Sequence, residues 1–323
     1  MFDTLVEKLK KDPKTIVFTE GPDARILEAT ARIKAEGIMK VVLVGNVAEV
    51  EAAAKKGGFD IEGVEIIDPE TYAEMDAMVA KMVELRKGKM TPEQCKANLL
   101  KGNYFGTMLV KMGKADCLLG GATYSTADTV RPALQLIKTK PGNSIVSSCF
   151  IMVRDKADGT QEKLAMGDCA INIHPTEDNL VEIAQETAKC AETFGIAPKV
   201  AFLSFSTKGS AKDDEVTKVQ NAVAKAKEVM TVPVDGEMQF DAAVAPEVGQ
   251  LKFPGSPVAG QANTFIFPDV TAGNIGYKIA ARLGGFAAYG PILLGLNAPI
   301  NDLSRGCNAD EVYKMSLITA CQS

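Results

Sequence analysis

The segment Asn301–Met315, NDLSRGCNADEVYKM, gathers a serine, an arginine, a cysteine and several acids in one short stretch. An arginine beside a hydroxyl can hold a phosphate group through two parallel hydrogen bonds. Asn308 followed three residues later by Glu311 matches a capping box, with Asn in place of Ser or Thr, and predicts a helix from Asn308 onward. That cap accounts for the acids, which suit the positive end of the helix dipole. It leaves Ser304 and Arg305, just before the cap, as a candidate anion site.

The single histidine of the chain, His174 in INIHPT, lies far from this segment and is predicted to end a strand just before a helix. Without an imidazole beside a serine or cysteine, Ser-His-Asp and Cys-His mechanisms are disfavoured. Any general base is then a carboxylate, or there is none. The seven cysteines are scattered singly without a C-x-x-C pair, which argues against a disulfide framework and against a zinc site.

The segment GGATYSTADTVRPALQ (120–135) turns from a predicted strand through two glycines into a predicted helix. Ser125 or Thr126 is expected to cap this helix, with Asp128 in its first turn and Arg131 one to two turns in. Backbone N–H groups at such a helix start attract phosphate. A plain capped helix with Arg131 in a salt bridge explains the pattern equally well. No GK[ST] follows the glycines, so a nucleotide-binding P-loop is not supported.

The segment PDVTAGNIGYKIAARLGG (268–285) repeats the strand, glycine loop and helix order. Gly273 and Gly276 open the helix, and Tyr277 and Lys278 follow. A G-x-x-G pattern is only half of a dinucleotide fingerprint. Close helix packing explains these glycines somewhat better than contact with a ligand.

A fourth candidate is the basic cluster in ELRKGKMTPEQ (84–94), which carries Arg86, Lys87 and Lys89. Such a cluster is usually a solvated surface. It can also pair with the outer phosphates of a bulky cofactor.

The composition is that of a soluble globular protein. The chain has 323 residues, 46% of them hydrophobic and 24% charged, which suggests about two domains. Its formal net charge of -5 gives no basic excess of the kind that nucleic-acid binding needs. The opening MFDTLVEKLKKDPK is charged and amphipathic, unlike a signal peptide, and no apolar run approaches the ~20 residues that span a bilayer. A cytoplasmic protein is therefore expected.

Short apolar β-rich runs alternate with amphipathic helical stretches along most of the chain. TIVFTEG precedes DARILEATARIKAEG, and KVVLVGN precedes VAEVEAAAKKGG, the pattern of strands buried on both faces in a parallel sheet. Helices are predicted to end at Gly37, Gly57 and Gly88. KPGNS (140–144) predicts a domain boundary, and the runs SIVSSCFIMVR and KLAMGDCAINI after it predict an antiparallel hairpin.

The chain resembles the phosphate acetyl/butyryltransferase family over essentially its full length, most clearly at STADTVRPALQ, TAGNIGYK and NDLSRGC. The resemblance implies reversible transfer of acetyl between coenzyme A and phosphate, with coenzyme A as a substrate, no metal or nicotinamide, and a homodimer. It implies a two-domain, three-layer α/β sandwich with mixed, mostly parallel sheets, similar to isocitrate/isopropylmalate dehydrogenase. The first domain would comprise 1–141 plus 302–323 and the second 142–301, with the active site in the cleft between them.

By the same resemblance the catalytic residues are Ser304, Arg305 and Glu311. The family motif reads S-R-G-C-x-x-E-D, with its aspartate as the base, and here Asp310 precedes Glu311, so the glutamate takes the aspartate's place. One helical residue is a rotation of about 100°, so Asp310 cannot simply stand in. A predicted substrate-binding set completes the site: Arg131, Arg86, Ser125, Thr126, Gly273, Asn274, Tyr277 and Lys278.

The implied mechanism is direct attack of the coenzyme A thiol on acetyl phosphate in a ternary complex. A helix N-terminus and a neighbouring arginine favour an ionised carboxylate, which works against Glu311 as a base until the site closes. The alternatives are a phosphate butyryltransferase and a noncatalytic acyl-CoA-sensing module, the latter opposed by the intact Ser304-Arg305 pair. An NAD-dependent decarboxylating dehydrogenase would need clustered metal-binding aspartates, and no D-x-x-x-D arrangement is present.

Overall fold

A computed structural model describes all residues 1–323 and divides the chain into two compact units. The first unit comprises Met1–Pro141 and Leu296–Ser323, and the second comprises Gly142–Gly295. The second unit was predicted to continue to residue 301. It ends earlier, because the strand Ile300–Asp302 pairs with Cys117–Gly120 of the first unit.

The first unit is built on a parallel five-stranded sheet in the order β11-β4-β1-β2-β3. Its strands are β1 (Thr15–Phe18), β2 (Lys40–Val44), β3 (Glu65–Ile67), β4 (Cys117–Gly120) and β11 (Ile300–Asp302). Its helices are α1 (Phe2–Lys11), α2 (Ala24–Glu36), α3 (Val47–Gly57), α4 (Met75–Arg86), α5 (Pro92–Leu99), α6 (Gly102–Lys111), α7 (Thr126–Pro132) and α13 (Ala309–Cys321), and a π-helical turn, Ala133–Ile137, follows α7.

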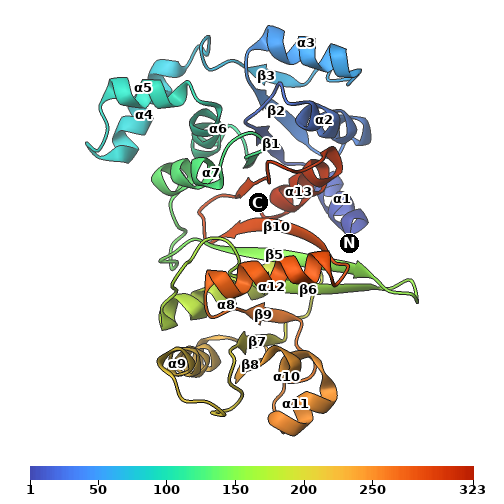
Figure 1. Cartoon of the computed structure of the whole chain (residues 1–323). Coiled ribbons are helices and arrows are strands. Elements are labelled where there is room, and N and C mark those ends of the chain that lie inside the picture. Colours follow the sequence, from blue (N-terminus) through green and yellow to red (C-terminus); the bar gives the residue numbers. More distant parts are fainter. The chain divides into compact units, whose positions relative to one another are not determined.

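Successive side chains of a strand point to opposite faces of the sheet, and here consecutive residues are buried, so both faces are covered. Val17, Val42 and Leu118 share one core with residues of α4, α5 and α6. Ile16 and Phe18, which alternate with Val17, are also fully buried, and α13 packs against β1 and β4 beside α2. Helices therefore lie on both sides of the sheet, as Figure 1 shows.

Because all five strands are parallel, their carboxyl ends meet at one edge of the sheet. The segments that follow β1, β4 and β11 begin at Thr19, Gly121 and Leu303, so they emerge together at this edge. Ligands of open α/β sheets bind outside the carboxyl ends of the strands. The first unit thus brings the SRGC segment and the glycine loop after β4 to the expected place for a site.

The second unit has a six-stranded mixed sheet in the order β10-β5-β6-β9-β7-β8. Strands β10, β5 and β6 pair antiparallel, which confirms the predicted hairpin, and the others are parallel. Helices α8 and α9 cover one face, and α10 and α12 cover the other. The elements are β5 (Ser147–Asp155), β6 (Gln161–Gly167), α8 (Glu177–Thr193), β7 (Val200–Leu203), α9 (Asp214–Val229), β8 (Val234–Met238), α10 (Phe240–Val244), α11 (Pro246–Lys252), β9 (Thr264–Ile266), α12 (Val270–Arg282) and β10 (Ala287–Leu294).

The α/β class with helix-covered, mostly parallel sheets is confirmed, and only local details differ from the prediction. Gly37 is a left-handed C-cap as predicted, but the next cap is Gly58 and the third is Lys87. His174 does not end a strand, because β6 stops at Gly167 and a loop follows it. None of the helices is both long enough and apolar enough to cross a membrane.

Candidate active site

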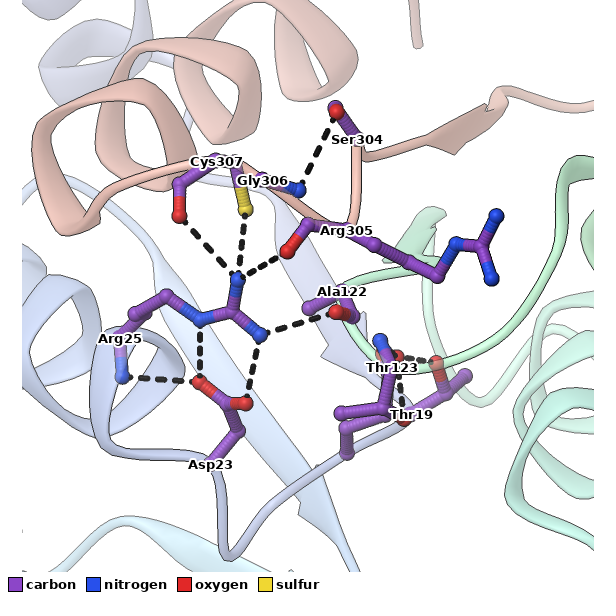
Figure 2. A network of polar contacts seen from close by, with 10 residues as sticks. Thr19, Asp23, Arg25, Ala122, Thr123, Ser304, Arg305, Gly306 and Cys307 are labelled. Carbon is purple, nitrogen blue, oxygen red and sulfur yellow. Dashed lines mark hydrogen bonds and ion pairs between the residues drawn. The ribbon is translucent and has the colours of Figure 1, made fainter.

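The turn Ser304–Cys307 connects β11 to α13 and is closed by its own hydrogen bonds (Figure 2). The N–H of Cys307 donates to the carbonyl of Ser304 at 2.9 Å. The N–H of Gly306 donates to Ser304 Oγ at 3.2 Å. The predicted serine and arginine therefore sit on a tight turn between a buried strand and a long helix.

Arg305 directs its side chain away from this turn into solvent. Its backbone carbonyl accepts a hydrogen bond from Arg25, whereas its guanidinium has neither a hydrogen-bond partner nor an ion-pair partner. A guanidinium carries five N–H donors in a planar fork that matches phosphate and carboxylate oxygens. The Arg305 guanidinium thus has no intramolecular anion, and anion binding by this residue stays a prediction.

Asp302, the last residue of β11, joins this strand to α7. It is 2% exposed, and its two carboxylate oxygens accept hydrogen bonds of 2.5 Å from the hydroxyls of Thr126 and Thr129. Burial raises the pKa of Asp302, and the two hydroxyls oppose that rise. Asp302 was not singled out from the sequence, although it stands two residues before Ser304.

Ser125 is the N-cap residue of α7, in line with the prediction that Ser125 or Thr126 stands at this helix start, but no side-chain hydrogen bond caps the helix. Ser125 occupies the N-cap position without a side-chain cap bond, and its hydroxyl donates to Asp128 Oδ2 at 2.7 Å. Thr126 donates to Asp302 instead. Ser125 thus bonds a carboxylate of its own first turn, whereas Thr126 bonds a carboxylate that the fold brings in. Each oxygen still has lone pairs, so the prediction that both residues bind substrate stays a prediction.

Arg86 and Arg131, the other predicted arginines, both influence the pKa of the Tyr104 phenol. Burial raises the pKa of Tyr104, and both guanidinium groups oppose this rise, so both lie within electrostatic range of its ring. Arg131 is exposed and has only a long contact of 3.5 Å to Asp128. Arg86 Nε is buried without a hydrogen-bond partner. A buried donor without a partner is costly. Substrate binding by Arg86 and Arg131 stays a prediction.

Glu311 forms the predicted capping box at the start of α13. Its carboxylate accepts from the N–H of Asn308 at 3.0 Å, and its own N–H donates to Asn308 Oδ1 at 2.9 Å. Asp310 is engaged differently, with Lys314 at 2.6 Å and Arg32 at 3.1 Å. The hydrogen bond from Lys314 is the main cause that lowers the pKa of Asp310. The structure therefore gives Asp310 a role in joining α13 to α2.

A buried carboxylate that sequence reasoning missed lies at the same sheet edge. Glu20 follows β1 and accepts from the N–H of Thr123 at 2.8 Å and from the hydroxyl of Thr19 at 3.0 Å. Burial is the main cause that raises its pKa, against the hydrogen bonds from Thr123 and Thr19. Glu20, Thr123 and Tyr124 line a cavity of about 370 Å³ beside the start of α6. Nothing in the spacing of Glu20 along the sequence indicated this position.

The predicted residues of the second unit lie on α12, and three of them contact β5 or the segment after β6. A Cβ on Gly273 would lie 2.3 Å from the carbonyl oxygen of Asp168, and Asn274 donates to the carbonyl of Cys169 at 3.1 Å. The rings of Tyr277 and Phe150 stack with centroids 4.0 Å apart. Lys278 is exposed. Close packing accounts for Gly273, and substrate binding by these four residues stays a prediction.

The remaining nucleophiles are poorly placed for covalent catalysis. All seven cysteines are free and buried. Burial raises the pKa of Cys307, the thiol nearest Arg305 in sequence, so this thiol stays protonated near neutrality. His174 is exposed in its loop.

The first unit is thus an open parallel α/β sheet with helices on both faces. An exposed, unpaired arginine and a serine lie at the carboxyl ends of its strands. The family model described as phosphate acetyl/butaryl transferase matches residues 1–320. A phosphate acetyltransferase of Bacillus subtilis is 53% identical over 100% of this chain and 99% of its own length. This chain therefore belongs to the phosphate acetyl/butyryltransferase family, and it is an enzyme, a transferase.

Solved structures agree with this membership. A phosphotransacetylase from Streptococcus pyogenes has a TM-score of 0.95 and 52% identity, covering 99% of this chain and 97% of its own. The EutD phosphotransacetylase from Staphylococcus aureus has a TM-score of 0.91 and 50% identity over the same shares. The similarity thus extends over both units.

Proposed function

We propose that this protein catalyses the reversible transfer of an acetyl group between coenzyme A and inorganic phosphate. The activity named for the relatives at about half identity supports this substrate pair. The observation that carries the proposal is the exposed, unpaired guanidinium of Arg305 beside Ser304, on a turn closed by hydrogen bonds. Such a group binds the phosphoryl oxygens of acetyl phosphate and stabilises the charge that grows on them as phosphate leaves.

The reaction runs as a direct displacement. The coenzyme A sulfur attacks the acetyl carbonyl carbon, the C–S bond forms, the C–O bond to phosphorus breaks, and phosphate departs with its electron pair. The thiol proton must leave during this attack, because an ordinary thiol with a pKa of about 8.5 is mostly protonated near neutrality. Ser304 donates to the carbonyl oxygen or to the thiol. No acyl-enzyme intermediate is needed, in keeping with the buried Cys307 thiol.

Glu311 is the proposed proton acceptor. One of its oxygens accepts the N–H of Asn308, and the other oxygen remains for the thiol. Proton removal in place is worth about 10²–10⁴-fold in rate. Arg86 and Arg131 are proposed to bind phosphate groups of coenzyme A or of the acyl donor, Arg86 through its unsatisfied Nε. Gly273, Asn274, Tyr277 and Lys278 complete the proposed substrate contacts.

Two alternative functions remain. One is phosphate butyryltransferase activity, which is the same reaction with a larger acyl group, and the other is a noncatalytic acyl-CoA-sensing module. The decisive assay mixes the purified protein with coenzyme A and acetyl phosphate, with a chelator present and nicotinamide absent, and follows thioester absorbance. Acetyl-CoA formation is expected, with a higher kcat/KM for acetyl phosphate than for butyryl phosphate. A higher kcat/KM for butyryl phosphate would assign the alternative activity. Binding of acetyl-CoA without turnover would assign a sensor.

We also propose a cytoplasmic homodimer. Seven free thiols suit a reducing compartment. Ile275 and Ile279 of α12 and its C-cap residue Leu283 are exposed at four-residue spacing, with Leu283 at 85%. A second copy of the chain is proposed to cover this apolar row. Light scattering is expected to give twice the 34.3 kDa chain mass, and the variant Ile279→Asp is expected to give one chain mass. A single chain mass for the parent would refute the dimer.

A further inference from the structure

Arg25, in the first turn of α2, is anchored by the N-cap residue Asp23. Arg25 Nε donates to Asp23 Oδ1 at 2.9 Å and Nη2 donates to Oδ2 at 2.8 Å, a bidentate pair. Asp23 Oδ1 also accepts the backbone N–H of Arg25 at 2.9 Å. The hydrogen bond from Arg25 is the main cause that lowers the pKa of Asp23. The guanidinium plane is thereby fixed before it contacts any other segment.

The rest of this guanidinium binds two loops at the carboxyl edge of the sheet (Figure 2). Nη1 donates to the carbonyl of Arg305 at 2.8 Å and to that of Cys307 at 3.1 Å. Nη2 donates to the carbonyl of Ala122 at 2.9 Å. With the two bonds to Asp23, these contacts use all five N–H donors of Arg25. A lysine has one nitrogen and cannot reproduce this planar set.

We propose that Arg25 is a positioning residue that acts through Arg305, because it holds the peptide from which the anion-binding side chain departs. Two carbonyls of one turn share a single donor nitrogen, which fixes the orientation of the Arg305 backbone. The Arg305 side chain then leaves in the opposite direction with no contact of its own to hold it. A misplacement of about 1 Å can lower a rate by about 10²-fold. This inference rests on the proposed function of Arg305.

Arg32 supplies a matched control from the same helix. It also bonds from α2 toward α13, with Asp310 at 3.1 Å, and its guanidinium lies 3.5 Å from the centroid of the Tyr313 ring. It donates to no carbonyl of the Ser304–Cys307 turn. Loss of Arg32 therefore reports how much activity depends on the contact between α2 and α13 alone.

The experiment compares Arg25→Lys with Arg32→Lys in the thioester assay. Arg25→Lys is expected to lower kcat/KM for acetyl phosphate by about 10–100-fold and to change KM for coenzyme A by less than about twofold. Arg32→Lys is expected to stay within about twofold of the parent in both. Equal losses in the two variants, or no loss in Arg25→Lys, would overturn the proposal. An inactive parent would refute the proposed function instead.

A double-mutant cycle separates positioning from general structure. In the Arg305→Ala background, Arg25→Lys is expected to add less than about twofold, since residues that act through one another are not additive. A full additional loss there would show that Arg25 acts by another route. If Arg25→Lys does not fold, as judged by circular dichroism, Asp23→Asn replaces it. Asp23→Asn keeps the helix cap and is expected to lower kcat/KM for acetyl phosphate about tenfold. In the Arg305→Ala background the same substitution is expected to cause no further loss.

Discussion

Replacing Arg305 by alanine is expected to lower kcat for acetyl-CoA formation by about 10²–10³-fold, the usual effect of removing one preorganised charge-stabilising donor. The free energy of unfolding is expected to change by less than about 0.5 kcal/mol, because the side chain is exposed and has no intramolecular partner. Steady-state kinetics with both substrates and urea unfolding measure the two quantities. The variant Arg305→Lys keeps the positive charge but loses the planar set of N–H donors, so its kcat is expected to lie between those of Arg305→Ala and the parent.

Glu311→Gln is the informative companion to this experiment. Glutamine can still accept the N–H of Asn308, so the cap is kept while the proton acceptor is removed. If Glu311→Gln keeps the parent rate and Arg305→Ala loses activity, binding and orientation alone drive the reaction. Parent-like kinetics in Arg305→Ala would instead remove the basis of the proposed function.

Replacing Gly121 by alanine is expected to cost about 3–5 kcal/mol of folding stability and to abolish activity at moderate temperature. The backbone of Gly121 has φ +96°, where side chains are strained. An added Cβ would also lie 2.2 Å from Asp302 Oδ1 and 3.0 Å from the carbonyl of Leu303. The clash falls on the carboxylate that fixes α7 and on the residue just before Ser304.

Gly113 is the matched control for this variant. It has φ +71° in the same unit, and an added Cβ would meet nothing within 4 Å. Gly113→Ala is expected to cost about 1 kcal/mol, the strain without the clash. Urea midpoints from far-UV circular dichroism, at unchanged slope, give both values. Equal costs in the two variants would contradict the clash at Asp302.

Features set by neighbouring residues were predictable from the sequence. The capping box of Asn308 and Glu311 depends on groups three residues apart, and it was found as predicted. The buried strands were recognisable because a sheet covered on both faces needs continuous apolar runs. The predicted end of one helix was wrong by a single residue, because Gly57 and Gly58 stand side by side and a helix can end at either with little difference in energy.

Features set by distant residues were not predictable. Thr126 matched a helix start, but the fold brings the carboxylate of Asp302 within reach, and the Thr126 hydroxyl donates to it instead of capping the helix. Arg25 looked like any first-turn arginine until the loops after β4 and β11 were seen to meet beside it. A sequence shows which residues have chemistry, whereas only the sheet order shows which of them share an edge.

Because the first unit is made of two separate stretches of the chain, it is completed last during translation. The strand β11 and the helix α13, which complete the first sheet and carry Arg305, are translated only after the whole of Gly142–Gly295. On the ribosome the second unit, being continuous, is available to fold while the first still lacks its edge strand. A translation product interrupted before Leu296 would therefore carry neither the Arg305 guanidinium nor the turn beneath it.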